Sequence, residues 1–226
     1  MDGKALITGF EPYGGRRVNP SGELAAALDG ARLGDLVVVG RTLPVVFAGL
    51  AARIEACLAE TRPAVVIALG LWPGEPMIRL ERLAVNLADC ASPDNAGALP
   101  SEELLHPDGA PALSATLPLR AIEAALLAEG IPARLSNTAG TFLCNATLYT
   151  LLRVIAQRGE HIPCGFIHLP YLPQQVAEML SGARAGRVDL QHGTDFASMD
   201  LATMERALRI ALAVTASEQH RGTKSP

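Results

Sequence analysis

The amino-acid sequence predicts an α/β fold, a three-layer α/β/α sandwich around a mixed, mostly parallel central sheet. Strand-like β-branched runs alternate along most of the chain with segments that repeat apolar residues at helical spacing. One run, Val-Val-Ile-Ala-Leu at residues 65–69, is apolar at every position. Such a strand is covered on both faces, as parallel and mixed sheets are when they lie between two layers of helices.

Each predicted element rests on a local pattern. The strands are short β-branched or apolar runs, expected at residues 5–8, 36–42, 65–69, 80–86, 133–136 and 165–169. The helices follow helical apolar spacing and are expected at residues 21–28, 47–60, 118–129, 141–157, 173–180 and 200–216. The last helix has one face formed by Leu201, Met204, Leu208 and Leu212.

The chain of 226 residues is long enough to bury a large core and fits one domain, which we expect at residues 1–216. The loop at residues 88–111 is rich in Pro, Asp and Gly, and the tail at residues 217–226 is polar. We expect both segments to be flexible, and neither has the character of a domain linker.

Composition limits the kinds of partner. Hydrophobic residues make up 49% of the chain, and its net charge of −4 gives no electrostatic reason to expect nucleic acid or an anionic membrane. No apolar run approaches the ~20 residues that cross a bilayer, and no signal-peptide segment follows Met1. We therefore expect a cytoplasmic protein that acts on a small molecule or a peptide.

The four cysteines include no C-x-x-C pair. This argues against a zinc ribbon and against a disulfide framework, so reduced thiols are expected. We expect Cys57, Cys90 and Cys164 to be ordinary packing residues. No metal ion and no other cofactor is expected.

Cys144 follows a polar turn and begins the apolar stripe of a predicted helix. The stripe continues at helical spacing through Leu148, Leu151, Leu152 and Ile155. Unpaired N–H groups and the dipole at a helix start favour thiolate over thiol, so this position predicts a nucleophile. The alternative is a small buried residue, because free cysteines are among the most buried residues.

A nucleophilic cysteine needs a base, and His168 is the histidine that lies inside an apolar strand, just before Pro170. The alternative is a hydrogen-bonded histidine in the core. The other histidines lie in polar or terminal segments without metal-ligand spacing, at His106, His161, His192 and His220.

Glu81 is the candidate carboxylate that orients the imidazole. It interrupts a strand-like stretch, where a charge without a partner is costly. The alternative is a solvent-facing glutamate paired with Arg79 or Arg82. Asp89 and Asp94 are rivals, but they lie on an irregular loop.

The loop after the first strand has the G-x-x-x-x-G spacing of a phosphate loop, from Gly9 to Gly14, but lacks the Lys-Ser/Thr pair that reaches phosphate and magnesium. This argues against a nucleotide site. The loop also carries Phe10 and Tyr13 at the carboxyl end of a strand, where open α/β sheets bind ligands. An aromatic-walled pocket is one interpretation, and a tight turn with packing aromatics is the other.

Five blocks of sequence together resemble the pyrrolidone carboxyl peptidase family, also called pyroglutamyl peptidase I. They include Gly-Phe-Glu-Pro-Tyr-Gly-Gly after the first strand and Gly-Thr-Phe-Leu-Cys-Asn around Cys144, and they lie at residues 5–21, 81–86, 93–97, 136–145 and 165–173. The resemblance implies a cytosolic cysteine peptidase of α/β/α fold that removes N-terminal pyroglutamate from peptides. It also implies a homo-oligomer, either a dimer or a tetramer.

The resemblance further implies roles for single residues. The family's Cys–His–Glu triad falls on Cys144, His168 and Glu81. The pyroglutamyl pocket is expected to involve Phe10, Tyr13, Val45, Leu71, Ser92, Phe142 and Leu143. Attack by Cys144 on the carbonyl of the pyroglutamyl group gives an acyl-enzyme, with His168 as the proton carrier and backbone N–H groups at the helix start near the oxyanion.

Three departures from the family pattern bear on catalytic efficiency and substrate range. Glu75 stands where the family usually has arginine, which reverses the charge. Ala91 also replaces an arginine, and Ser92 replaces an apolar pocket residue. Losing one donor near the oxyanion typically costs ~10²–10³ in rate. Tyr13, in place of the usual phenylalanine, adds a hydroxyl that needs a partner.

Two other functions remain open from the sequence. One is a pyroglutamyl- or lactam-binding protein that has kept the pocket while the changes at Glu75 and Ala91 removed useful catalysis. The other is a nucleoside phosphorylase-like transferase, which the glycine loop favours and the absence of a basic phosphate site opposes.

Overall fold

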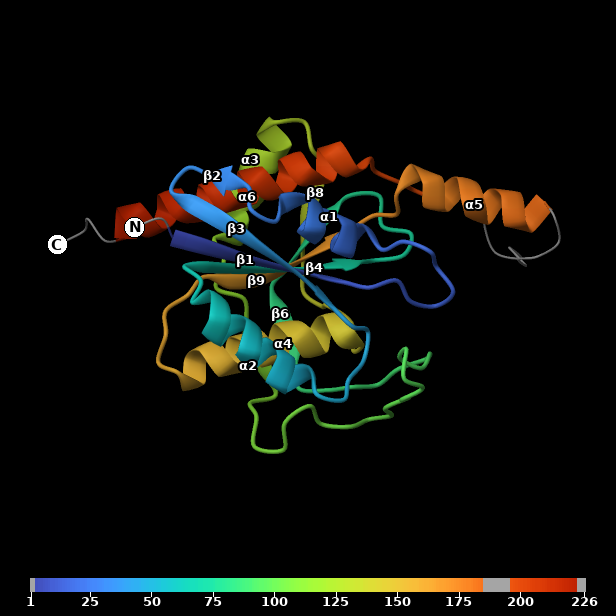
Figure 1. Ribbon diagram of the computed structural model, residues 1–226, viewed down its shortest axis with the longest axis horizontal. Helices are drawn as coiled ribbons and strands as arrows, with labels where there is room; N and C mark the ends of the chain where they lie inside the picture. Colours follow the sequence, from blue (N-terminus) through green and yellow to red (C-terminus); the bar gives the residue numbers. More distant parts are fainter. Residues whose placement is uncertain (1–2, 185–195, 223–226) are drawn as a thin grey trace.

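A computed structural model of the chain describes residues 3–184 and 196–222. Strands and helices alternate along most of it (Figure 1). In chain order the elements are β1 (Gly3–Phe10), α1 (Pro20–Leu28), β2 (Arg32–Leu33), β3 (Leu36–Leu43), α2 (Leu50–Thr61), β4 (Val65–Leu71), β5 (Ile78–Glu81), β6 (Leu83–Val85), β7 (Ala112–Ser114), α3 (Leu119–Ala128), β8 (Ala133–Ser136), α4 (Leu143–Gln157), β9 (Cys164–Leu169), α5 (Pro173–Arg184) and α6 (Leu201–Gly222).

Within these residues a seven-stranded sheet has the order β2-β3-β1-β4-β9-β5-β8. Strands β3, β1, β4 and β9 are parallel to one another. Strand β5 runs antiparallel to β9 and parallel to β8, while β2 is antiparallel to β3. The sheet is therefore mixed and mostly parallel, and this prediction is confirmed.

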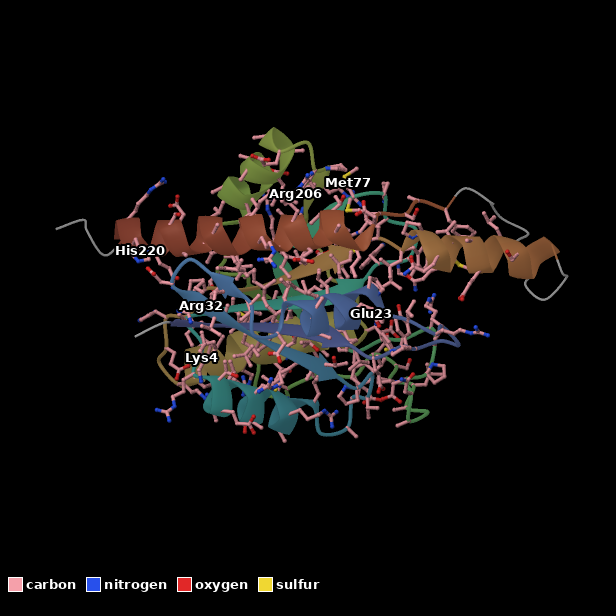
Figure 2. The ribbon with its side chains drawn as sticks, turned by 45° about the horizontal axis from the view of Figure 1, so that its top comes forward. Lys4, Glu23, Arg32, Met77, Arg206 and His220 are labelled. Atoms are coloured by element: carbon pink, nitrogen blue, oxygen red, sulfur yellow. The ribbon has the colours of Figure 1, made fainter. Side chains whose placement is uncertain are left out.

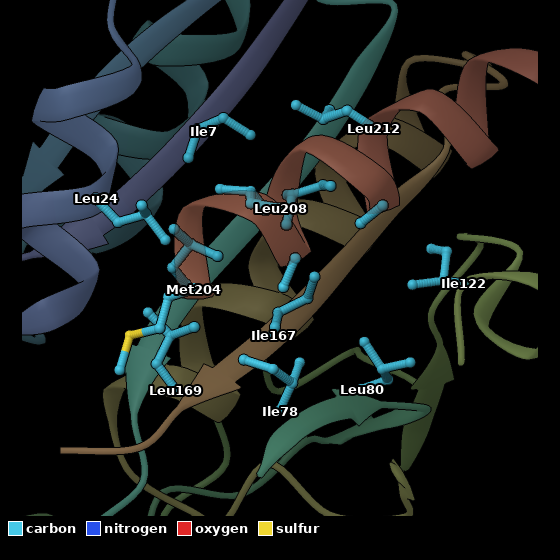
Figure 3. Packing of buried hydrophobic residues seen from close by; sticks show 14 of the residues in the cluster. Ile7, Leu24, Ile78, Leu80, Ile122, Ile167, Leu169, Met204, Leu208 and Leu212 are labelled. Atoms are coloured by element: carbon cyan, nitrogen blue, oxygen red, sulfur yellow. The ribbon is translucent and has the colours of Figure 1, made fainter. Parts of the chain in front are cut away.

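Helices cover both faces of this sheet (Figure 1). On one face, α1, α3 and α6 bury an apolar cluster that includes Ile7, Leu24 and Leu208 (Figure 3). On the other face, α2 and α4 bury a second cluster that includes Leu6 and Ile54. Every residue of the central strand β4 is buried. The predicted three-layer α/β/α sandwich is confirmed.

The strand predicted at residues 80–86 is wrong in one respect, because the chain forms two strands there. β5 ends at Glu81 and belongs to the large sheet, whereas β6 pairs with β7 in a separate two-stranded sheet. The break falls at Arg82, whose N–H donates to Ser136 O and whose carbonyl accepts from Ala115 N. Strands β2 and β7 are too short to give a sequence signal.

The last helix is longer than predicted. α6 continues to Gly222, beyond the expected end at residue 216, so the first part of the predicted polar tail is helical. Thr215 is fully buried, and the side-chain amide of Gln219 donates to Ala64 O at 3.1 Å. The contacts of α6 with the rest of the protein therefore continue beyond Leu212, the last residue of its apolar face. Residues 223–226 lie outside the described residues.

The described surface carries charge on several elements. Lys4, Glu23 and Arg206 are exposed and project outward (Figure 2). None of the helices in the described ranges combines the length and the apolar character that a membrane span requires.

Candidate active site

The candidate site forms where four strands of the large sheet lie side by side. In the register of the sheet, Gly70 of β4 lies opposite His168 of β9, and His168 lies opposite Arg79 of β5. Arg79 in turn lies opposite Arg134 of β8. A row of one small and three ionisable residues thus crosses the sheet near the carboxyl ends of β4 and β9.

His168 and Glu81 form a buried hydrogen-bonded pair. The Nδ1 atom of His168 lies 2.8 Å from Oε1 of Glu81, and the two residues are 1% and 0% exposed. Because a carboxylate accepts, Nδ1–H donates and Nε2 stays free to take a proton. Burial lowers the pKa of His168, although Glu81 opposes this effect. The imidazole is therefore neutral near pH 7 and able to act as a base.

Glu81 has a second partner. The same oxygen, Oε1, accepts from Nε of Arg79 at 3.0 Å. Glu81 therefore contacts His168, as one interpretation of the sequence expected, and pairs with Arg79, as the other expected. It is buried and does not face solvent. Its other oxygen, Oε2, is buried and has no hydrogen-bond partner in the part of the chain described.

Cys144 lies in the first turn of α4, as predicted. The helix begins at Leu143, after Phe142 in an extended conformation. A Cβ added to Gly70 would lie 2.8 Å from Sγ of Cys144, so the thiol rests directly on this glycine. Gly70 is also the neighbour of His168 in the sheet. The thiol on α4 and the imidazole on β9 therefore both lie beside Gly70, although the two elements are separate in the sequence.

The resting state of Cys144 differs from the expectation. Burial raises the pKa of the thiol to about 12, and the charge of Glu81 adds to the rise. A hydrogen bond from its own backbone N–H lowers the pKa but does not compensate. Loss of water on burial therefore outweighs the backbone hydrogen bond in its effect on this pKa. The thiol is protonated at neutral pH and needs a base to react.

Asn145 fixes the start of α4, a role that the sequence did not reveal. Its side chain is fully buried, accepts from Val85 N at 2.8 Å and donates to the carbonyls of Val85 and Leu87. These bonds attach the residue next to Cys144 to β6 and the chain after it.

Aromatic side chains gather above the start of α4. The ring of Phe142 lies 6.2 Å from that of Tyr13 and 5.6 Å from that of Phe47, between ring centroids. Phe47 was not among the predicted site residues, because it sits at the start of a predicted helix. Tyr13 and Phe142, two of the predicted wall residues, are thus neighbours, and Phe47 packs against Phe142.

The loop at residues 88–111 closes one side of the site. The carboxylate of Asp94 accepts from the backbone N–H groups of Phe47, Ala96 and Ala98, which together hold its pKa low despite burial. Asn95 donates to Glu11 Oε1 at 2.7 Å. This part of the loop, expected to be flexible, is therefore hydrogen-bonded to the segments that carry Tyr13 and Phe47.

A pocket of about 600 Å³ opens between this loop and the aromatic residues. It is lined by Tyr13, Gly14, Arg16, Pro73, Asp89, Cys90, Ala91, Ser92, Pro93, Thr141 and Phe142. Ser92 is exposed at this surface. The other predicted pocket residues are buried behind it and do not line it, namely Phe10, Val45, Leu71 and Leu143.

Arg16 is the basic side chain in this lining. Its guanidinium lies 4.8 Å from the ring centroid of Tyr13 and donates to the hydroxyl of Tyr171 at 3.2 Å. Burial raises the pKa of Tyr13 to about 12, and Cys144 adds to the rise while Arg16 opposes it. Tyr13 therefore stays a neutral phenol beside the guanidinium of Arg16. Arg16 was not among the residues predicted from the sequence.

The rival acidic residues and other cysteines take no part in the His168 pair. Asp89 is exposed in the pocket lining, and Asp94 is occupied by backbone N–H groups. Cys57 and Cys164 are free thiols whose pKa burial raises. Among residues 3–184 and 196–222, no three His, Cys, Asp or Glu side chains are grouped in a way that would hold a metal ion.

Comparison with known proteins places this geometry in a family. The family model described as Pyroglutamyl peptidase matches residues 3–218. A pyrrolidone-carboxylate peptidase of Cupriavidus pinatubonensis is 43% identical, over 93% of this chain and 91% of its own length. One from Bacillus subtilis is 38% identical over 100% of this chain and 98% of its own. The solved pyrrolidone carboxyl peptidase of Thermococcus litoralis superposes with a TM-score of 0.89, at 38% identity, over 97% of this chain and 96% of its own.

Proposed function

The chain belongs to the pyroglutamyl peptidase family, and we propose that it removes N-terminal pyroglutamate from peptides with Cys144 as nucleophile, His168 as base and Glu81 as the orienting carboxylate. One observation carries the proposal. The thiol of Cys144 rests on Gly70, the strand neighbour of His168, and His168 is hydrogen-bonded to Glu81 at 2.8 Å. This is the arrangement of nucleophile, base and orienting group that covalent catalysis requires.

The first step follows from the two pKa directions. Cys144 holds its proton at neutral pH, and His168 is neutral with Nε2 free. His168 therefore takes the thiol proton as Sγ attacks the carbonyl carbon of the pyroglutamyl group. The imidazolium that forms is stabilised by the carboxylate of Glu81, to which Nδ1 is hydrogen-bonded.

Two protons pass through His168 in the remaining steps. His168 first gives the thiol proton to the nitrogen of the departing peptide, and the carbon–nitrogen bond breaks to leave a thioester on Cys144. A water molecule then enters, loses a proton to His168 and attacks the thioester carbonyl. Release of pyroglutamate returns the proton to Cys144, so the catalyst is unchanged.

Backbone N–H groups at the start of α4 are placed to hold the oxyanion. The N–H of Ala146 donates to Phe142 O at 3.0 Å, which leaves the N–H groups of the preceding helical residues without helical partners. The N–H of Cys144 is hydrogen-bonded to its own thiol, and these groups together carry the positive end of the helix dipole. They supply preorganised donors where negative charge develops on the substrate oxygen.

The aromatic cluster around Phe142 suits a flat lactam ring. Tyr13, Phe47 and Phe142 offer aromatic faces, and a pyroglutamyl group is a planar five-membered amide that packs against such faces. Phe10, Val45 and Leu143 are buried in the apolar cluster against which these three rings pack. Assembly into a dimer or a tetramer and a cytoplasmic location stay predictions, and light scattering on the purified chain tests the first.

The direct test is hydrolysis of a pyroglutamyl arylamide. We expect turnover by the wild-type chain, loss of turnover in Cys144→Ala and inactivation by iodoacetamide. Cys57→Ala is the matched control, because Cys57 is a free, partly exposed thiol of α2 that does not line the pocket beside Phe142 and has no part in the scheme. Turnover by Cys144→Ala contradicts the proposal. Thermal stabilisation of the wild type by a lactam ligand without any turnover would instead identify a binding protein.

A further inference from the structure

Two buried charges beside the site have no part in the Cys–His–Glu scheme. Glu75 and Arg79 are 4% and 6% exposed. Nη1 of Arg79 lies 3.3 Å from Oε2 of Glu75, and Nε of Arg79 lies 3.0 Å from Oε1 of Glu81. Arg134 completes the series with bonds of 3.1 Å and 2.7 Å to the two carboxylate oxygens of Glu75. An alternating row of charges therefore runs from the surface to His168.

The sheet register explains this row. Arg79 and Arg134 are direct neighbours on the parallel strands β5 and β8, so two like charges lie side by side. Glu75, from the turn between β4 and β5, accepts from both and offsets their repulsion. The glutamate that appeared in the sequence as a reversed charge is thus the partner of two arginines. Its negative charge is balanced by Arg79 and Arg134.

Arg79 is held on every side. Its Nη2 atom donates to Ser136 Oγ at 2.7 Å and to Thr138 O at 2.9 Å. Its guanidinium lies 3.8 Å from the ring centroid of Trp72, which in turn packs edge-on against His168 at 4.9 Å. All three nitrogens are engaged. A guanidinium fixed in this way presents a permanent positive charge at one position beside the base.

We propose that Arg79 is a positioning residue of the reaction, which fixes Glu81 against His168 and holds a positive charge beside the imidazole, and that Glu75 partly neutralises this charge. The proposal rests on the proposed function, because it assigns to Arg79 an influence on the base that serves Cys144. Arg79 acts through Glu81 and through its charge.

The charges facing His168 have opposing effects. Glu81 and Glu75 favour the imidazolium and raise the pKa of His168, whereas Arg79 disfavours it and adds to the lowering caused by burial. The side chains on the other sides are the neutral thiol of Cys144 and the rings of Trp72 and Phe166. His168 acts as a base only above its pKa. Removing Arg79 should therefore move the onset of activity to higher pH, and removing Glu75 should move it to lower pH.

The test measures kcat/KM for a pyroglutamyl arylamide against pH in the full chain, because the acidic limb of this profile reports the base of the free enzyme. We expect Arg79→Met to shift the limb upward by about one pH unit, since one charge at this range shifts a pKa by ~1–3 units. Glu75→Gln should shift it downward. Arg79→Lys keeps the charge and should leave the limb near the wild-type position, while kcat falls because the fixed contact with Glu81 is lost.

Opposite shifts separate this role from a structural one, which would lower activity without moving the limb. An unmoved limb, or a shift in the same direction for Arg79→Met and Glu75→Gln, overturns the proposal. If Arg79→Met does not fold, as judged by circular dichroism, the near-isosteric Glu75→Gln carries the test. An inactive wild type, or an active Cys144→Ala, would instead overturn the proposed function.

Discussion

The two faces of strands β5 and β9 differ sharply in chemistry. On one face Ile78, Leu80 and Ile167 join the apolar cluster beneath α3 and α6 (Figure 3). On the other face, alternate residues of the same strands are Arg79, Glu81 and His168, all buried. Because successive side chains of a strand point to opposite faces, the same short strands contribute both to a core and to the candidate active site. Residues on both faces are buried, so burial does not tell the core residues from the candidate site residues. The hydrogen bonds among Arg79, Glu81 and His168 do.

The largest expected effect comes from a single methyl group on the charged face. In Gly70→Ala the new Cβ would lie 2.8 Å from Sγ of Cys144 and 2.8 Å from a ring carbon of Phe166, so one of them must move. A displacement of about 1 Å from productive geometry costs ~10² in rate, and we expect kcat/KM to fall by at least that factor. Steady-state assay with the arylamide measures this, and unchanged kcat/KM would contradict the placement of the thiol.

The apolar face should respond in stability and not in chemistry. Ile167 is 3% exposed and neighbours His168 in the chain, but it packs on the opposite face. We expect Ile167→Ala to lower the free energy of unfolding by ~2–5 kcal/mol because it leaves a cavity. Denaturant titration measures the loss. The kcat/KM of the folded variant should stay within a few-fold of the wild type, and a hundredfold loss would show that the two faces are coupled.

The smallest expected effect concerns the missing arginine. Ala91 lines the pocket that already holds the guanidinium of Arg16. We therefore expect Ala91→Arg to raise kcat/KM by less than the ~10²–10³ that one oxyanion donor supplies. The gain should grow in the Arg16→Met background, where the pocket lacks its basic side chain. A full gain in the wild-type background would show that Arg16 does not substitute for the missing charge.

Most elements of the fold could be predicted because their patterns are local. Helical spacing located α1, α3 and α4 to within two residues of each end, and the apolar run at residues 65–69 identified the central strand. The misses share a cause. β6 separates from β5, and α6 continues past its apolar stripe, because pairing with distant segments decides where an element ends.

The site divides in the same way. The sequence alone determined that Cys144 lies at the start of a helix, that His168 lies near the end of a strand and that Glu81 is a costly charge in a strand-like stretch, since each depends only on neighbours along the chain. Only the tertiary structure decided that burial keeps Cys144 protonated, that Arg16 lines the pocket, that Phe47 packs against Phe142, and that Glu75 offsets Arg79. Loss of water and strand register set pKa and ion pairing, and both arise when segments far apart in sequence pack together.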